Sequence, residues 1–484
     1  MSGRTNRFPV CGAPPHRSLQ RGVLALLLAA SLGACTTLGP DYARPTVPLP
    51  QAWPDAPETQ GAAQRIDAGW WRLYGDPQLT GLVESAIARN PDALIAAAQV
   101  EEAEAVLREA HAALFPQVDV AGQGTRSRVS TAGAQPVPPG VPVVRSDFRA
   151  TLSTAFEIDF WGRLRRAEEA VRAQLAATRS ARDVTALTLA GTTAQAYFLL
   201  RSLDAQIGLS RATLALREES TALVRSRVVG GIASELELRQ AEGAAADIAA
   251  QIVELRRQRA QLRHQLAALT ARPGMELEAG DLERIPVPPA PPPGLPSALL
   301  DRRPDVRAAE QALVAANARI GVAKAAMMPT ISLTGSFGTQ SRDLSDLLTR
   351  GAGIWSVGAG LTLPLFDAGR LAARADQAEA RARQAVAGYA KVAENAYREV
   401  ADALTNVQRS AESEAAQQSR VDAAAGAARL ARKRWEAGYS PYLEVLDAER
   451  GLNDASLAVL RARQARLAYS VDLMKSLGGG WSGN

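Results

Sequence analysis

Apolar and polar residues alternate in two short segments of the chain. Residues 148–160 and 355–365 place mainly apolar side chains at every second position, with polar or small side chains between them. A period of two is typical of a β-strand with one apolar face. Residues 117–129 and 330–340 alternate more weakly and precede these segments, so the sequence predicts two β-hairpins.

A helical pattern follows each predicted hairpin. Residues 162–229 and 370–436 contain no proline, and each is long enough for one helix of roughly 100 Å. Residues 234–270 and 441–477 then repeat apolar side chains at alternating steps of three and four. The second of these segments has two apolar seams, which indicates two neighbouring helices. A helix in the wall of a helical tube has two neighbours, and so does a helix at the centre of an ordinary bundle.

The two halves of the chain are an internal duplication. Four pairs of segments match in register: residues 90–92 with 303–305, 115–118 with 328–331, 162–163 with 369–370, and 231–242 with 438–449. The numbering offset is 213 in the first two pairs and 207 in the last two. Each half therefore has the same order of helix, β-hairpin, very long helix and shorter helix.

The N-terminus has the pattern of a targeting segment. Arg17 and Arg21 precede an apolar run that is too short to cross a membrane, as in a signal peptide. The sequence Leu-Gly-Ala-Cys at residues 32–35 resembles the lipobox of bacterial lipoproteins, in which the cysteine is lipidated and becomes the first mature residue. Cys35 is therefore the predicted lipidation site, and the alternative is an ordinary signal peptide that contains a cysteine.

Composition argues against an enzyme. The chain has three histidines and two cysteines, so acid–base, thiolate or metal chemistry has few residues to use. Residues 1–34 hold four arginines and no acids, so their removal lowers the formal charge from +5 to +1 and leaves no argument for nucleic acid. We expect no metal, and no cofactor other than a covalent lipid on Cys35.

The predicted strands are too few to close a barrel within one chain. They are about long enough for the ~9–11 residues of a tilted membrane strand, and Phe160 and Trp161 stand at a strand end, where aromatic belts occur. The smallest outer-membrane barrels use about eight strands, and an open sheet edge has no hydrogen-bond partner in lipid. If the strands lie in a membrane, the protein is an oligomer that shares one barrel.

A set of short motifs resembles the TolC-like outer membrane efflux proteins, specifically the lipoprotein (NodT-type) branch. The resemblance covers nearly the whole mature chain. The motifs are Leu-Gly-Pro-Asp-Tyr-Ala-Arg-Pro at residues 38–45, Trp70-Trp71, Asp76-Pro77, Asn90-Pro91-Asp92, Phe115-Pro116, Phe-Trp-Gly-Arg at 160–163, Leu-Pro-Leu-Phe-Asp-Ala-Gly-Arg at 363–370, Leu-Glu-Val-Leu-Asp-Ala-Glu at 443–449 and Leu-Gly-Gly-Gly-Trp at 477–481.

The resemblance implies a mainly α fold with a small β part. Three chains would share a twelve-stranded β-barrel in the outer membrane, on a twelve-helix α-barrel tube that reaches across the periplasm. Such a homotrimer is a non-catalytic exit channel that docks onto a periplasmic adaptor (membrane fusion) protein and an inner-membrane efflux pump. A lipid-anchored periplasmic coiled-coil scaffold without a pore is the alternative. The apolar strand faces favour the channel, because a soluble hairpin would need another element to cover them.

The combined pattern predicts the following organisation. It comprises a signal peptide (1–34), a lipid-anchored segment with an equatorial collar (35–77), a first repeat (78–285) with a β-hairpin (117–160) and a helical hairpin (162–270), a Pro-rich joint (286–296), a second repeat (297–477) with a β-hairpin (330–365) and a helical hairpin (370–477), and a C-terminal tail (478–484).

The resemblance also places a gate at the periplasmic end of the tube. Family aperture positions correspond to Leu443 and Asp447, with Glu444 beside them and Glu237 at the matching place in the first repeat. Three copies of Leu443 would form an apolar plug, and three copies of Asp447 an anionic ring. The alternatives are a helix-capping role for Glu237 and a solvated helix face for Asp447.

Glycine turns separate the long helices from the shorter ones. Gly230, Gly231 and Gly438 follow basic helix ends, Ser234 begins a capping-box pattern, and Ser440 precedes a proline as an N-cap would. These five residues are the predicted adaptor-docking tips. The alternative is that the glycines are plain helix stops, and both roles can hold together.

Overall fold

The computed structural model describes residues 37–53, 67–134, 137–291 and 296–480 of the chain, so Cys35 and its lipobox lie outside them. Two compact units are distinguished, and each is described by itself. One holds all four strands, within Ala105–Arg172 and Val314–Arg383. The other holds most of the helical residues.

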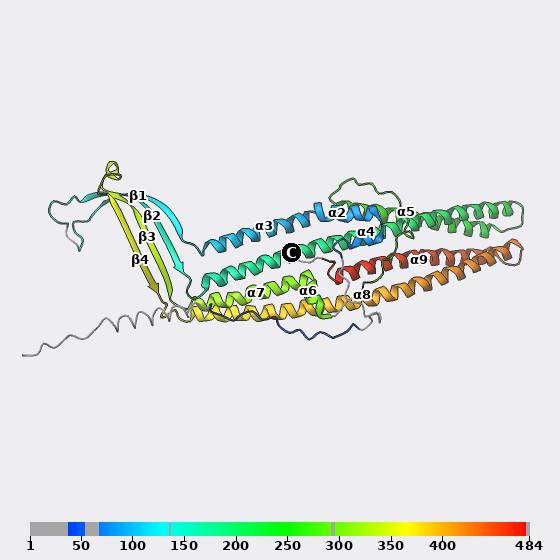
Figure 1. Cartoon of the computed structure of the whole chain (residues 1–484). Helices are drawn as coiled ribbons and strands as arrows, with labels where there is room; N and C mark the ends of the chain where they lie inside the picture. Colours follow the sequence, from blue (N-terminus) through cyan, green and yellow to red (C-terminus); the bar gives the residue numbers. More distant parts are fainter. Residues whose placement is uncertain (1–36, 54–66, 135–136, 292–295, 481–484) are drawn as a thin grey trace, which may run out of the picture. The chain divides into compact units, whose positions relative to one another are not determined.

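Helices dominate the described chain (Figure 1). They are η1 (Trp70–Tyr74), α2 (Pro77–Arg89), α3 (Pro91–Ala112), α4 (Arg163–Val229), α5 (Glu235–Leu269), η2 (Pro296–Ala298), α6 (Leu299–Arg302), α7 (Pro304–Ala325), η3 (Leu344–Asp346), α8 (Arg370–Glu436) and α9 (Tyr442–Ser476), and the strands are β1 (Gln117–Arg128), β2 (Val144–Ile158), β3 (Thr330–Ser341) and β4 (Gly353–Thr362).

The predicted duplication is confirmed at the level of element bounds. Helix α7 repeats α3 at a numbering offset of 213 at both ends, and α8 and α9 repeat α4 and α5 at an offset of 207. Strand β3 likewise repeats β1 at an offset of 213 at both ends, but β4 has 10 residues where β2 has 15. Strand β2 also begins four residues before the predicted start at residue 148.

The helical segment before the first hairpin is divided, where one helix was expected. Asn90 has an extended backbone with ψ of 135°, because the residue before Pro91 is excluded from the helical region. The Asn90 side chain accepts a hydrogen bond from Asp92 N, and its amide donates to Leu269 O at the end of α5. This break therefore ties the start of α3 to the first helical hairpin.

The four strands form one antiparallel sheet in the order β1-β2-β3-β4. Their register aligns the apolar positions of both repeats on a single face. That face carries Val118, Val120, Phe148, Leu152, Phe156, Ile158, Ile331, Leu333, Phe337, Trp355, Val357 and Leu361. The opposite face is polar and includes Asp119, Gln123, Ser153, Glu157, Ser336 and Ser356.

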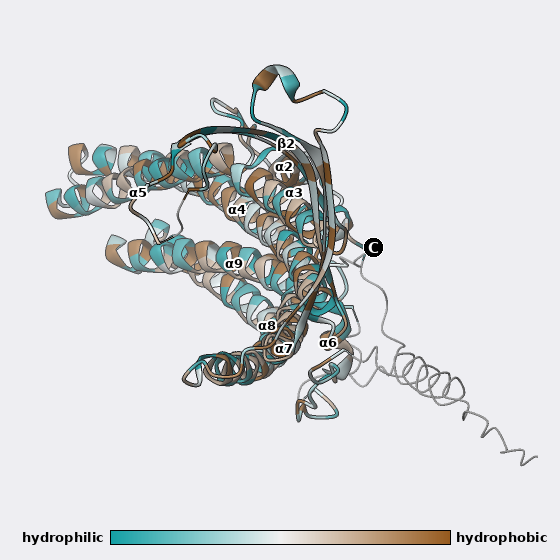
Figure 2. Ribbon diagram, turned by 90° about the vertical axis from the view of Figure 1, so that its left-hand side faces the viewer, coloured by the Kyte–Doolittle hydropathy of each residue, from teal (hydrophilic) through white to brown (hydrophobic). Residues whose placement is uncertain are grey.

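The helical unit buries its apolar stripes between helices. Figure 2 shows hydrophobic and hydrophilic positions alternating along α5 and α9. The seam of α9 that contains Leu457 and Leu467 is largely buried, and the seam that contains Val445 and Leu473 is partly buried. One central cluster joins η1, α2, α4 and α9 through Trp70, Trp71, Tyr74, Leu79, Leu82, Tyr197, Phe198, Leu467 and Val471. The two tryptophans are thus core residues.

None of the described helices is both long enough and apolar enough to cross a membrane.

Candidate functional site

The two helical hairpins turn in the same way. Helix α4 ends before Gly231, which has φ of +70°, and α8 ends before Gly438, with φ of +79°. In each turn the glycine N–H donates to the carbonyl three residues back, and the next N–H reaches the carbonyl five residues back. This pairing satisfies carbonyls at the helix ends and needs a left-handed residue, so glycine is required there. The predicted helix stops are confirmed.

The start of α5 is a capping box. The Ser234 hydroxyl accepts from Glu237 N at 3.3 Å, and a Glu237 carboxylate oxygen accepts from Ser234 N at 3.1 Å. The capping interpretation of Glu237 is therefore confirmed. A second role for this residue at a gate stays a prediction.

The expected N-cap of α9 was wrong. The capping residue is Pro441 and not Ser440, and no side chain caps the helix there. Pro441 is the repeat equivalent of Ser234, so the duplication keeps the cap position but replaces the capping side chain. The Ser440 hydroxyl is buried and has no hydrogen-bond partner among the described residues.

The predicted gate residues lie on the first turns of α9. Leu443 is 56% exposed, and Glu444 and Asp447 are also exposed. Glu444 lies 3.6 Å from the Arg434 guanidinium, whereas Asp447 forms no ion pair with any described residue. An exposed leucine and an unpaired carboxylate one turn apart are available for contacts outside the chain.

An aromatic cluster joins the tips of the two hairpins within one chain. Trp435 of α8 and Tyr442 of α9 have ring centroids 5.1 Å apart. The Arg227 guanidinium of α4 lies 4.1 Å from the centre of the Trp435 ring, a cation–π contact between the hairpins. Burial raises the pKa of the Tyr442 phenol above its ordinary value.

A buried ion cluster holds the hairpins together further along. Glu449 of α9 forms an ion pair with Arg217 of α4 at 2.8 Å and accepts hydrogen bonds from Arg432 of α8. Arg217 is 4% exposed, and the cluster borders a cavity of about 370 Å³. The hydrogen bond to Glu449 raises the pKa of the Arg432 guanidinium. One carboxylate therefore joins three helices through two guanidinium groups.

Sequence reasoning missed this cluster, although the duplication contained a signal for part of it. Arg225 and Glu242 form the same pair in the first hairpin at 2.9 Å, and they are the repeat equivalents of Arg432 and Glu449. A charge pair repeated at the same spacing indicates a contact across the hairpin. Arg217 has no such counterpart, because Ala424 occupies the equivalent place. The contact of Arg217 with Glu449 is therefore evident only in the folded structure.

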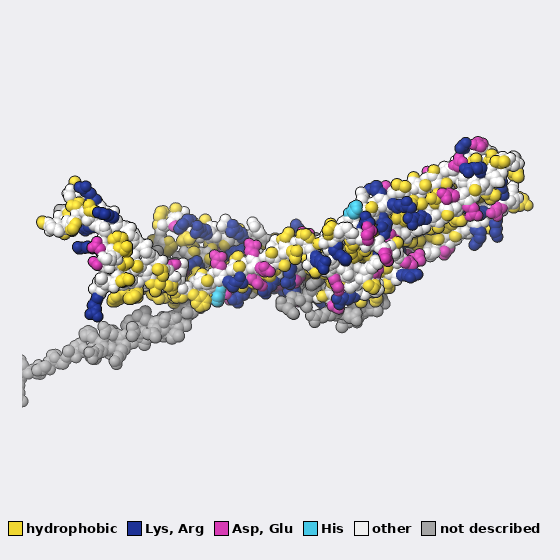
Figure 3. All heavy atoms as spheres, turned by 90° about the horizontal axis from the view of Figure 1, so that it is seen from above, with side chains coloured by type: hydrophobic (Ala, Val, Ile, Leu, Met, Phe, Trp, Pro, Cys, Tyr) yellow, Lys and Arg dark blue, Asp and Glu magenta, His cyan; other side chains and the backbone are white. Residues whose placement is uncertain are grey.

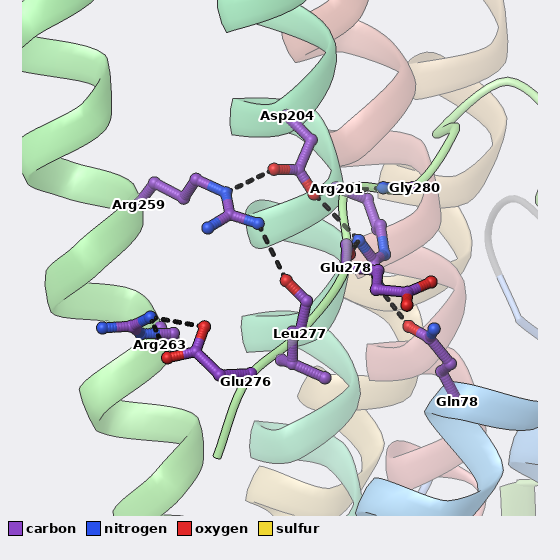
Figure 4. Close-up of polar contacts among 9 residues, drawn as sticks. All are labelled: Gln78, Arg201, Asp204, Arg259, Arg263, Glu276, Leu277, Glu278 and Gly280. Atoms are coloured by element: carbon purple, nitrogen blue, oxygen red, sulfur yellow. Dashed lines mark hydrogen bonds and ion pairs between the residues drawn. The ribbon is translucent and has the colours of Figure 1, made fainter. Parts of the chain in front are cut away.

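A second buried polar network fixes the segment that follows α5 (Figure 4). Asp204 of α4 accepts from Arg201 at 2.8 Å and from Arg259 of α5 at 2.5 Å. Arg201 also donates to the Glu278 carbonyl at 2.6 Å, and Gly280 N donates to Asp204 at 3.3 Å. A Cβ at residue 280 would lie 2.7 Å from the Arg201 guanidinium, so any larger residue there would have to displace this arginine.

No group of three or more His, Cys, Asp or Glu side chains among the described residues is placed to hold a metal ion. The features that remain are two glycine turns, an exposed acidic and apolar helix start, and a sheet with one apolar face.

Residues 82–272 and 295–479 match the outer membrane efflux protein family. The chain belongs to this family.

Individual relatives agree along almost the whole chain. The probable efflux pump outer membrane protein TtgC of Pseudomonas putida is 35% identical over 477 residues, which cover 96% of each chain. The cation efflux system protein CusC of Escherichia coli is 34% identical over 466 residues, with 95% of this chain and 98% of CusC covered. The structure of the open state of the Neisseria gonorrhoeae MtrE outer membrane channel superposes with a TM-score of 0.84 at 32% identity, covering 92% and 98%.

Family membership decides between the two functions that the sequence left open. The chain is an outer membrane efflux channel whose fold is that of the trimeric channels of the family, and the scaffold without a pore is not supported. The predicted fold class is confirmed, and the family is one of transport proteins.

Proposed function

We propose that three copies of this chain form the exit channel of a tripartite efflux system, with a gate at the turn ends of the second helical hairpins. The observation that carries the proposal is the four-stranded sheet, which exposes one continuous apolar face and leaves the outer edges of β1 and β4 unpaired among the described residues. Backbone groups at such edges need partners in lipid. Pairing β1 of one chain with β4 of the next, in a closed ring of three, supplies them.

The helical tips support docking onto a periplasmic adaptor. TtgC is named as part of an efflux pump and CusC as part of a cation efflux system, so these relatives work with other components. The tips of this chain expose Val229, Ile232 and Tyr439 next to the two turns. Exposed apolar side chains on a helical hairpin suit end-on packing against a coiled coil. We infer that an adaptor and an inner-membrane pump supply substrate choice and energy.

The gate proposal rests on the position of α9. Leu443 and Asp447 are exposed on adjacent turns and project from a helix whose other faces are packed against its neighbours. Three copies of the pair would form an apolar ring beside an anionic one. Glu444 and Glu237 occupy the same third helical position in α9 and α5, so both could contribute carboxylates nearby. MtrE is described in an open state, which shows that a relative has a channel that opens.

Substituting Cys35→Ser is expected to abolish lipid attachment and leave the trimer able to assemble. The barrel itself would anchor the protein, and an acyl chain adds only about 0.8 kcal/mol per buried methylene. The measurements are the mass of the mature protein and its sedimentation after detergent extraction. A variant that no longer assembles would show that the lipid, and not the barrel, carries the anchoring.

Substituting Gly438→Leu is expected to weaken adaptor binding by roughly tenfold or more while sparing the trimer. A leucine would strain the turn, which has φ of +79°, and would add bulk at the docking surface. Binding of the purified trimer to its adaptor measures the effect.

Gly140→Leu is the matched control for this substitution. Gly140 has φ of +85° and open space around it, as Gly438 does, but lies in the β1–β2 loop. It therefore carries the same backbone strain without touching the tip. Equal adaptor binding by the wild type and Gly438→Leu would contradict docking at the tip, and equal losses in both variants would assign the effect to strain.

A further inference from the structure

The apolar face of the sheet ends in two arginines. Arg126 and Arg128 of β1 pair with Ser146 and Val144 of β2, so they lie on the same face as Val120 and Leu152. Both arginines are exposed, and neither forms a hydrogen bond or ion pair with a described residue. A face that is apolar along most of its length thus becomes cationic at the end that carries the loops.

The extent of the apolar band sets the depth of these arginines. On β2 the band runs from Phe148 to Ile158, about 34 Å along the strand at ~3.4 Å per residue. At the usual tilt this length matches the ~25 Å apolar band of outer-membrane barrels. Phe160 and Trp161 stack edge to face just past the helix-proximal end, where an aromatic girdle is expected.

Phe148 marks the other edge of the band. It pairs with Gly124 of β1, and a Cβ on that glycine would lie 3.2 Å from the Phe148 ring. Arg126 and Arg128 lie two and four residues past Gly124 on β1, about 7 and 14 Å further along the strand. This places their guanidinium groups at the level of the lipid headgroups and not among the acyl chains.

The charge on this part of the face has one sign. The other strand residues that share it level with Phe148 or beyond are Ser341, Ser146 and Val144, none of which is ionisable. The acidic residue nearest in β2, Asp147, lies on the opposite face and accepts a hydrogen bond from Gln340. Figure 3 shows several dark-blue basic side chains, with fewer magenta acidic ones, at the left-hand end of the molecule where the sheet lies.

We propose that Arg126 and Arg128 bind the phosphate groups of lipid headgroups in the outer leaflet of the outer membrane. The inference rests on the proposed channel, which places the loop end of the sheet outside the cell. Guanidinium groups match phosphate oxygens in bidentate pairs, and the apolar residues below them receive the acyl chains of the same lipid. One site would be repeated three times around the barrel.

The test compares two lipids on the full-length trimer in detergent. The probes are lipid A with two phosphates and the same lipid with its phosphates removed, and bound lipid is counted by native mass spectrometry. We expect the wild type to bind the phosphorylated lipid roughly tenfold or more tightly than the dephosphorylated one. The reason is that two arginines together attract an anionic headgroup strongly enough to change the affinity by about that factor. The double variant R126Q/R128Q should lose most of this preference.

The matched control is R145Q. Arg145 lies at the same end of β2 but on the opposite face, and it donates to the Pro142 carbonyl. It should keep the wild-type preference. Equal binding of the two lipids by a wild-type trimer that conducts ions would overturn the lipid site and leave the channel standing. A wild type that binds the phosphorylated lipid but forms no trimer and no pore would overturn the channel instead, and displacement of the lipid by millimolar inorganic phosphate would overturn the lipid assignment.

Discussion

Asp204→Ala is expected to destabilise the protein by about 3–5 kcal/mol, the range found when one partner of a buried ion pair is removed. Its carboxylate joins Arg201 and Arg259, and the side chains of Asp204 and Arg201 are only 3% and 2% exposed. Without it the Arg201 charge stays buried beside the Glu278 carbonyl and the Tyr197 ring, with no carboxylate partner. The measurements are thermal unfolding of the purified protein and its rate of proteolysis between residues 270 and 291.

Glu276→Ala is the matched control. Glu276 is bonded to Arg263 of α5 at 2.9 Å and holds the same segment, but its side chain is 81% exposed (Figure 4). A surface pair contributes about 0–1 kcal/mol, so this variant should stay close to the wild type. Equal stability of the two variants would mean that the buried network does not determine how the segment is held.

Asp447→Ala is expected to raise the single-channel conductance roughly twofold or more and to reduce cation preference. Three carboxylates at an aperture attract cations and narrow the passage, so replacing all three removes charge and bulk together. Recording from the purified trimer in a planar bilayer gives both quantities. Low conductance in the wild type that rises in the variant would support the gate.

Gln240→Ala serves as its control, because Gln240 is the repeat equivalent of Asp447 in α5 and carries no charge. Ion selectivity should not change in this variant. If the conductance and selectivity of Asp447→Ala both match those of the wild type, Asp447 belongs to a solvated helix face and the gate lies elsewhere.

Duplication followed by divergence explains where the two hairpins differ. The glycine turns and the Arg–Glu pair across each hairpin are the same in both. The capping serine of α5 has become Pro441 in α9, and Glu449 has gained Arg217 as a further partner from the first hairpin. Helix α9 therefore lacks the side-chain cap that α5 has, and an ion pair with α4 of the first hairpin adds to its contacts. This asymmetry fits the proposal that the tip of the second hairpin is the part of the chain that gates.

The sequence by itself determined the repeat, the two β-hairpins, the long helices and the glycine turns. Each of these depends on a local signal, such as a period of two, a heptad, a missing proline or a left-handed glycine, which the chain carries wherever it folds. The same locality explains why the cap at Ser440 was misjudged, since either of two adjacent residues could begin α9. The proposed gate residues Leu443 and Asp447 came instead from the family motif at residues 443–449, and their role stays a prediction.

Only the tertiary structure decided which distant side chains meet. The register between β2 and β3 brings the apolar faces of both repeats together, and no periodic pattern specifies pairing between strands so far apart in the chain. Arg217 reaches Glu449, and Asp204 reaches Gly280, because packing of the helices brings them into contact. Buried charges are stable only when such partners are in place, so their positions follow from the packed fold and not from the order of residues.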